Sequence, residues 1–255
     1  MQQEKPCIGT IEKISNYSDS KSYIDRALII RRDQVKLSRD YAQDCAESCE
    51  KHGLKYEFIQ AIEFMERDAA FAAVGVKAKH KYNNTIGNIC CHASHVKCWK
   101  RIIELGKPCI ILEHDALIVG DVQHIETPDM AVVTFGHRVI AKDSYSPPNK
   151  PTELIEIKKA VGVHACGLTP TTATWLYENA RDVGIDVGVD RWLMMQRSSG
   201  LPLYVCEPPQ AVCWARVSTS NFKETDKNKD CERKGSTVNN YKEALTEGWH
   251  KGLKK

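Results

Sequence analysis

One stretch, Pro108 to Val119 (PCIILEHDALIV), constrains the fold more than any other part of the chain. Four buriable residues, Cys109 to Leu112, run directly into the polar tripeptide EHD. A short apolar run that follows a proline predicts a buried strand, and strands covered on both faces are typical of helix-flanked sheets. The acidic residues therefore stand at the carboxyl end of a central strand, where open α/β sheets bind their ligands.

The two carboxylates of this stretch are candidate metal ligands. In extended backbone, Glu113 and Asp115 are two residues apart and point to the same face, so both can reach one cation. Magnesium and manganese prefer oxygen ligands and often keep positions open for substrate phosphates. Because E-x-D tripeptides are common, a strand that merely ends in polar residues remains the alternative.

The opening third has the strand, helix, strand order of a nucleotide-binding α/β half. Ala27–Ile30 predicts a first buried strand, and the helix after it ends at His52–Gly53, before a second strand over Tyr56–Ile62. Arg31 and Arg32 follow the first strand directly. At that position they can meet the base, ribose or diphosphate of a nucleotide, or remain ordinary surface charges.

A second candidate metal site involves two histidines. The pattern of apolar residues predicts a helix over Ile86–Gly106, with glycine as its stop signal. His92 and His95 are three residues apart on this helix, so they can share a face and, with Asp115, form a zinc-type hydrolase site. The alternative is structural: one histidine hydrogen-bonded at the junction of sheet and helix, the other exposed.

The second half of the chain predicts further strands and another helix, and with the first half an α/β fold. Ala131–Phe135 and Val161–Leu168 are expected to be strands, and Thr169–Pro170 begins a helix with proline in its first turn. Leu203–Val205 is expected to be a final short strand, followed by a loop from Cys206 to Ser220.

Composition is that of a soluble globular protein, with 27% charged and 42% hydrophobic residues in a chain of 255. That length suits one large domain. The eleven cysteines are scattered without a C-x-x-C pair, which predicts small buried side chains in a reducing compartment. The chain shows neither an apolar run near the roughly 20 residues that span a bilayer nor an apolar signal core at its start, so we expect a cytoplasmic protein.

The net charge of +3 lies in the C-terminal segment. Residues 221–255 hold nine Lys or Arg against six Asp or Glu, and the preceding residues balance at 27 and 27. A basic segment of this kind can contact nucleic-acid phosphate, although it is more often a solvated end. We expect an irregular lead-in over residues 1–22, one domain over residues 23–220, and a Lys-rich, partly docked tail over residues 221–255.

Taken in order, the pieces resemble glycosyltransferase family 25, the lipooligosaccharide galactosyltransferase group. The resemblance runs from Ala27 to Ser220 and rests on four blocks: Gly87, Cys91, Ser94-His95 and Trp99-Lys100; Ile111 to Ala116; Gly167 to Pro170; and Val189 to Trp192. It implies a GT-A-like, Rossmann-type mixed sheet flanked by helices in a single domain. It also implies a nucleotide-sugar donor, such as a UDP-sugar, and a manganese or magnesium ion at the acidic motif.

Carried over by position, the resemblance makes Glu113 and Asp115 the residues that hold the metal and the diphosphate. The family commonly has Leu-Glu-Asp-Asp at this point, and His114 stands here in place of the middle acid, so one negative charge near the cation is missing. Ser94, His95 and His114 are further candidates for donor binding.

The same resemblance implies inversion at the anomeric carbon by direct displacement, which requires a base for the acceptor hydroxyl. A general base contributes roughly 10² to 10⁴ in rate. Asp190 lies in the matching segment and is our candidate, with Asp186 in reserve; capping of the following helix is the structural alternative for Asp190.

The acceptor and two other functions stay open at this point. A glycan or lipid-linked saccharide is the expected acceptor, and a hydroxylated DNA base is a second one. A metallohydrolase that uses His92, His95 and Asp115 is a different enzyme class. A catalytically inactive module that binds nucleotide-sugars or nucleic acid is also compatible with His114 and the basic tail.

Overall fold

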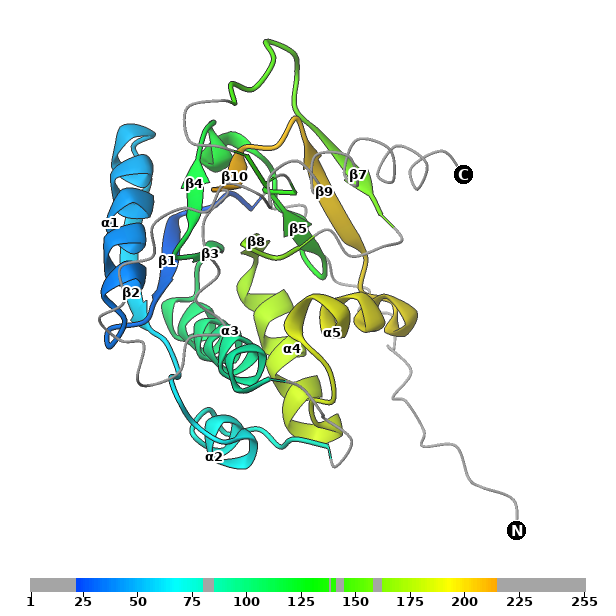
Figure 1. The fold of residues 1–255 in the computed structure, drawn as a ribbon. Coiled ribbons are helices and arrows are strands. Elements are labelled where there is room, and N and C mark those ends of the chain that lie inside the picture. The colour runs from blue at the N-terminus through cyan, green and yellow to red at the C-terminus, as the bar shows by residue number, and fades with distance from the viewer. Residues whose placement is uncertain (1–21, 80–84, 138, 141–144, 158–161, 215–255) are drawn as a thin grey trace.

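The computed structural model describes residues 22–79, 85–137, 139–140, 145–157 and 162–214. A mixed sheet with the strand order β2-β1-β3-β8-β5-β9-β7 runs through these residues (Figure 1). Strands β1, β2 and β3 are mutually parallel, and β8 and β7 run antiparallel to their neighbours. The strands are β1 (Arg26–Arg31), β2 (Lys55–Gln60), β3 (Cys109–Glu113), β5 (Val132–Thr134), β7 (Glu153–Glu156), β8 (Ala165–Leu168) and β9 (Leu203–Glu207). The predicted α/β fold with a mixed sheet is confirmed.

A smaller sheet of three strands, in the order β4-β10-β6, lies beside the carboxyl end of β3. It consists of β4 (Ala116–Ile118), β6 (Val139–Ile140) and β10 (Ala211–Trp214). The loop predicted from Cys206 onward is therefore wrong in part, since β9 extends to Glu207 and Ala211 begins another strand. Strand β10 pairs with β4, almost 100 residues earlier in the chain. A local sequence pattern cannot predict pairing with so distant a segment.

Helices cover both faces of the large sheet (Figure 1). They are α1 (Lys36–Lys51), α2 (Arg67–Ala72), α3 (Ile86–Leu105), α4 (Pro170–Val183) and α5 (Val189–Gln196), with single 3-10 turns at Val122–His124 and Arg197–Ser199. Side chains alternate along β1: Ala27 and Ile29 join the core under α1, and Leu28 and Ile30 join the core under the other helices. None of the helices in the described part of the chain is long and apolar enough to cross a membrane.

Local signals fix the ends of α3 and α4. The Thr85 hydroxyl accepts a hydrogen bond from the Asn88 N–H at the start of α3, and Gly106 ends the helix with a left-handed φ of 62°. Thr169 caps α4 in the same way, and Pro170 follows in the first turn. Both predicted helix starts are confirmed. A short link, residues 106–108, connects α3 to β3.

The cysteines behave as small apolar side chains. The nine cysteines in the described ranges are all free thiols, and seven of them are buried. Cys45 and Cys49 face the sheet from α1, four residues apart. Cys91 and Cys213 are partly exposed, and both contact acidic side chains at the end of β3.

Candidate functional site

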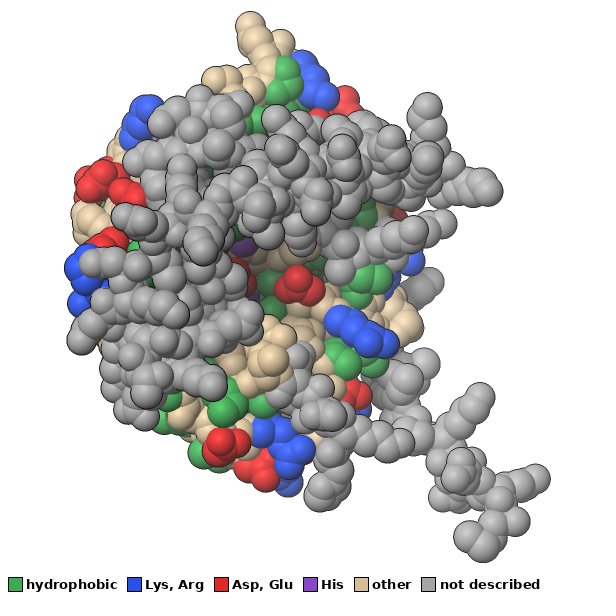
Figure 2. Space-filling view, in the orientation of Figure 1, with side chains coloured by type: hydrophobic (Ala, Val, Ile, Leu, Met, Phe, Trp, Pro, Cys, Tyr) green, Lys and Arg blue, Asp and Glu red, His purple; other side chains and the backbone are tan. Residues whose placement is uncertain are grey.

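A pocket opens where β1 and β3 end, beside the first turns of α3. It encloses about 690 Å³ of empty space, including the part open to solvent. A space-filling view shows acidic and histidine side chains in a hollow on one face of the molecule (Figure 2). The pocket is lined by Ile30, Arg32, Ala61, Ile62, Phe64, Ile86, Gly87, Cys90, Cys91, Ser94, Glu113, His114 and Asp115. It therefore lies at the predicted edge of the sheet.

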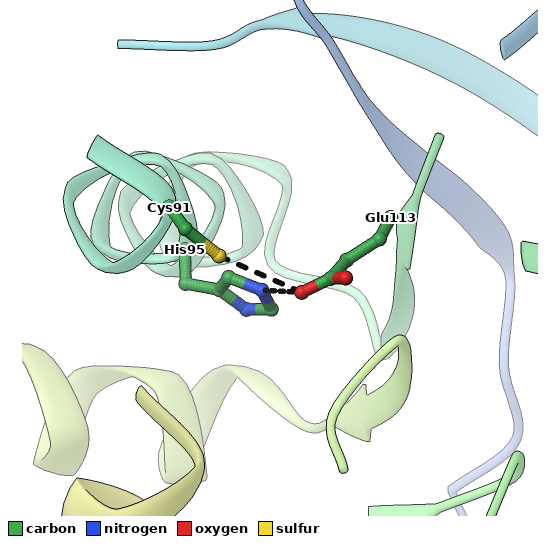
Figure 3. Close-up of side chains that lie close together, drawn as sticks. All are labelled: Cys91, His95 and Glu113. Atoms are coloured by element: carbon green, nitrogen blue, oxygen red, sulfur yellow. Dashed lines mark hydrogen bonds and ion pairs between the residues drawn. The ribbon is translucent and has the colours of Figure 1, made fainter. Parts of the chain in front are cut away.

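Glu113, the last residue of β3, is the charged centre of the site. Its Oε1 accepts from His95 Nε2 and from Cys91 Sγ, each at 3.5 Å (Figure 3). Burial alone would raise the pKa of Glu113, but the hydrogen bond from His95 and the charges of His95, His164 and His114 outweigh it and lower the pKa to about 2. Glu113 is therefore an anion at neutral pH.

Asp115 also lines this pocket, although the backbone that leads to it is a turn and not the extended strand that we expected. His114 and Asp115 form a turn between β3 and β4, so the extended backbone that we expected between the two carboxylates is absent. The Oδ2 atom of Asp115 accepts from Cys213 Sγ at 3.4 Å. Its Oδ1 atom is buried without a hydrogen-bond partner among the described residues. A buried carboxylate oxygen in that state is a place for a cation or a donor group.

The two arginines after β1 differ in their position relative to the pocket. Arg31 pairs with Asp33 at 2.6 Å and stacks on the Phe58 ring, and it is not among the residues that line the pocket. Arg32 lines the pocket, lies 4.7 Å from the centroid of the Phe64 ring and pairs with Glu63 at 3.5 Å. Of the two, Arg32 is the guanidinium group that faces the cavity.

Phe64 is a pocket residue that sequence reasoning missed. It adopts a φ of 54°, a left-handed backbone conformation that bulky residues rarely take. With Ile62 and Ile86 it contributes apolar side chains to the pocket that Glu113 and Asp115 also line.

Two of the predicted donor-binding residues have structural partners. Ser94 lines the pocket, and its hydroxyl donates to the Cys90 carbonyl at 2.7 Å and accepts from the Ile62 N–H at 2.9 Å. It thereby ties the segment after β2 to α3. His114 also lines the pocket, and its ring stacks on Tyr41 with 6.0 Å between centroids.

Asp190 and Asp186 are in different environments. Asp190 lies in the first turn of α5, one residue past the start, so it does not serve as the cap. It is open to solvent, yet the protein around it removes part of its hydration, and together with the charge of Glu113 this raises the pKa of Asp190 to about 6. Asp186 pairs with Lys79 at 3.7 Å. Neither aspartate is among the residues that line the pocket, and of the two, Asp190 is the one whose pKa the charge of Glu113 raises.

His92 does not join His95 and Asp115, so the arrangement expected for a zinc hydrolase is wrong. The His92 ring packs edge-on among Phe71, Trp99 and Trp192, and its Nδ1–H donates to the Val187 carbonyl at 2.9 Å. Three residues along a helix leave an offset of about 60°. That offset turns His92 into the aromatic core while His95 faces β3. Both histidines are fully buried. The structural alternative, in which one of them was expected to be exposed, is therefore also wrong on that point.

The burial of His92 predicts a loss of stability in mild acid. Loss of hydration, together with the charge of His95, lowers the pKa of His92 to about 3, against an unfolded value of about 6.5. Between these values the unfolded chain binds one more proton. The free energy of unfolding should therefore fall as the pH drops through this window, by up to about 1.4 kcal/mol per pH unit. Denaturant unfolding at several pH values between 7 and 4.5 measures the slope.

Two variants isolate this contribution. His92→Gln removes the titrating ring and keeps an N–H that can reach Val187, so its stability should depend less steeply on pH. His124→Gln changes an exposed histidine and should keep the wild-type slope. His164, whose pKa burial also lowers, titrates in all three proteins, so the difference between them is what counts. Equal slopes in wild type and His92→Gln would contradict the assignment.

His164 and Cys91 were also missed as members of the site. The Glu113 N–H donates to the His164 carbonyl oxygen at 2.9 Å, and His164 Nε2 is buried without a partner in the described part of the chain. The antiparallel pairing of β3 with β8 brings His164 to the site from 51 positions away. Cys91 is part of the motif on which the family resemblance rests, but the sequence does not show its contact with Glu113.

Comparison with known families gives the context for this geometry. The model of glycosyltransferase family 25, described as an LPS biosynthesis protein, matches residues 35–185, more than half of the chain. The chain belongs to glycosyltransferase family 25. It is therefore a glycosyltransferase, and the predicted family and enzyme class are confirmed. The family match includes the pocket residues of α3 and β3 and ends before Asp186 and Asp190.

Other comparisons are more distant from this family 25 chain. No curated protein sequence matches it. Drosophila beta-1,4-galactosyltransferase 7, solved with manganese, UDP-Gal and xylobiose, is 10% identical, with a TM-score of 0.41 over 83% of this chain and 77% of that one. A glycosyltransferase involved in glycosylation of the major capsid of PBCV-1 is 8% identical, with a TM-score of 0.39 over 75% of this chain and 96% of that one.

Proposed function

We propose that this family 25 enzyme transfers a sugar from a nucleotide-sugar, such as a UDP-sugar, to an acceptor hydroxyl with a divalent cation and with inversion. The observation that carries the proposal is one pocket that is lined by two carboxylates, Glu113 and Asp115, and by Arg32. A site that binds a diphosphate through a cation needs both anionic ligands for the metal and a cationic side chain for the phosphates.

The residues of the pocket fit a divalent cation. Glu113 is ionised, and Asp115 has a buried Oδ1 atom with no partner among the described residues. Two carboxylates with room for phosphate oxygens are what magnesium and manganese sites use. Bound to Glu113 and Asp115, such a cation would act as a Lewis acid on the departing diphosphate, an effect worth several kcal/mol.

The shape of the pocket supports binding of a nucleotide. Ile62, Phe64 and Ile86 offer apolar surface on which a base can lie, in the same pocket as the carboxylates. Arg32 can donate two parallel hydrogen bonds to a phosphate, which a lysine could not do. The Arg32 guanidinium is held by Glu63 and Phe64, so little side-chain freedom is lost when it binds.

Asp190 is our candidate for the base. In the transfer, the acceptor oxygen forms a bond to the anomeric carbon as the bond from that carbon to the diphosphate breaks, and the acceptor proton passes to a carboxylate oxygen. A pKa of about 6 leaves Asp190 mostly ionised at neutral pH and more basic than an ordinary aspartate. Asp186 remains the reserve, since its carboxylate is already paired with Lys79.

We propose a glycan or lipid-linked saccharide as the acceptor. DNA with a hydroxylated base is the second candidate, and its motivation, the basic tail over residues 221–255, lies outside the described residues. The two acceptors differ in their response to salt. A protein that neutralises several phosphates loses affinity steeply between about 50 and 200 mM salt. Transfer to a neutral saccharide should depend on salt much less steeply, because only the diphosphate of the donor is then charged.

A screen of donors tests the proposed function. The full chain is stripped with a chelator and incubated with UDP-, GDP- and CMP-sugars, with and without manganese or magnesium, and release of the nucleotide is measured. We expect at least one donor to be turned over, only after manganese or magnesium is restored. Nuclear magnetic resonance of the product then gives its anomeric configuration, which should be opposite to that of the donor.

Each alternative predicts a different outcome of this screen. Full turnover in the presence of the chelator would contradict the metal requirement. Binding of a nucleotide-sugar without any turnover would favour an inactive binding module. Retention of the anomeric configuration would contradict direct displacement and the role of Asp190 as base.

A further inference from the structure

Three potential metal ligands meet at the edge of the pocket. Cys91 and His95 are one turn apart on α3 and point toward Glu113 at the end of β3 (Figure 3). Cys91 Sγ and His95 Nε2 are each 3.5 Å from Glu113 Oε1, and the three ligand atoms all lie within 4.8 Å of one another. Helix geometry explains the convergence, since residues i and i+4 share one face.

Two of these three distances match a tetrahedral zinc site. Zinc lies about 2.3 Å from sulfur and about 2.0–2.1 Å from nitrogen or oxygen. Around a tetrahedral ion those bond lengths separate neighbouring ligand atoms by roughly 3.3–3.6 Å. The two contacts of Glu113 Oε1 are already at that separation. The sulfur of Cys91 and the nitrogen of His95 lie within 4.8 Å of each other, so an ion would have to draw these two atoms together by at most about 1.2 Å.

The chemistry of the three donors selects the same metal. Thiolate and imidazole are ligands for zinc, whereas magnesium and manganese prefer carboxylates, carbonyls and water. Three protein ligands also leave a fourth position of a tetrahedral zinc open. Cys91 lines the pocket and Glu113 is partly exposed, so the ion has a path to its ligands.

We propose that Cys91, His95 and Glu113 form a zinc-binding site that takes Glu113 away from the donor's cation, so that zinc inhibits transfer. On binding, the Cys91 thiol loses its proton to solvent and its sulfur bonds to the ion, while His95 binds as the neutral ring. Zinc binding itself is independent of the proposed function. Inhibition rests on the proposed function, because inhibition requires Glu113 to be a ligand of the cation that binds the donor.

Direct binding tests the site without reference to activity. The full chain is titrated with zinc by equilibrium dialysis, and with cobalt(II) as a spectroscopic substitute whose thiolate charge-transfer band reports a bond to sulfur. We expect the wild type to show that band. Cys91→Ser should abolish it, and Cys91→Ser and His95→Gln should each weaken zinc binding by more than about 100-fold, beyond the range typical of losing an outer-shell partner.

The neighbouring cysteine supplies a matched control. Cys90 is next to Cys91 on α3, and its Sγ donates to the Met65 carbonyl at 3.6 Å rather than to Glu113. Cys90→Ser should leave zinc affinity and the cobalt band unchanged. If Cys91→Ser binds zinc as tightly as the wild type does, or if Cys90→Ser alone loses the band, the proposed site is wrong.

Activity separates this inference from the proposed function. With saturating manganese and an active donor, added zinc should inhibit the wild type, and the inhibition should be weaker in Cys91→Ser. Zinc binding that depends on Cys91 but leaves transfer unaffected would overturn the shared role of Glu113. Zinc binding that depends on Cys91 in a chain that turns over no donor would support the site and contradict the proposed function.

Discussion

Asparagine at position 190 is expected to lower the rate of transfer by roughly 10² to 10⁴, the range that a general base contributes. Asp190→Asn removes the group that accepts the acceptor's proton and keeps its size. Donor binding should change little, so the loss should appear in kcat rather than in KM for the nucleotide-sugar. Steady-state kinetics with the donor identified by the screen provides the measurement.

The pH profile of the wild type gives an independent check on Asp190. A base works in its ionised form, so activity should fall as the pH drops through the pKa of Asp190. The partial loss of hydration and the charge of Glu113 raise that pKa to about 6, and a cation beside Glu113 would cancel part of the repulsion. The acidic limb of kcat/KM should therefore lie at or below pH 6, above the ordinary range for aspartate.

Asp186→Asn is the matched control for the base. It makes the same change four residues earlier, at a carboxylate that pairs with Lys79. We expect it to retain most of the activity, with at most a small loss of stability from a partly exposed ion pair. A large loss in Asp186→Asn with little effect of Asp190→Asn would exchange the roles of the two residues.

Removal of both carboxylates of the acidic motif is expected to cost at least about 10³-fold in transfer, since single electrostatic groups in active sites contribute 10² to 10³. Glu113→Gln with Asp115→Asn keeps the shape of the pocket and removes two negative charges. The affinity for manganese should fall in parallel, and calorimetric titration in the presence of the nucleotide measures it. Unimpaired transfer by the double variant would disprove the proposed metal site.

Glu153→Gln serves as the control for charge. Glu153 is exposed on β7, at the far edge of the sheet from β1 and β2, and its replacement should change neither transfer nor manganese affinity. The melting temperatures of all variants should be compared first, because Glu113 also holds His95 and Cys91. A double variant that has lost its fold would show a lower melting temperature, whereas loss of the metal site alone would not.

Sequence patterns predicted most of the regular elements because those elements depend on nearby residues. Four buried residues in a row before an acid predicted β3, and Thr85, Gly106 and Pro170 fix helix ends within one turn of themselves. Strand β10 escaped prediction because its partner β4 lies far away in the chain.

The composition of the site was partly predictable for the same reason. The apolar run places Glu113 at the end of a strand, and the order of motifs gave the family. The turn at His114–Asp115 was not visible, since these polar residues allow both an extended and a turned backbone.

By itself, then, the sequence determined the α/β class, the family and the acidic end of β3, because these follow from short runs of residues and their order. Tertiary structure alone decided which side chains meet there. It brought His95 and Cys91 onto Glu113, turned His92 into the aromatic core and set Arg32, rather than Arg31, on the pocket wall. The direction in which a side chain points depends on how helices and strands pack against one another, and no local pattern specifies that.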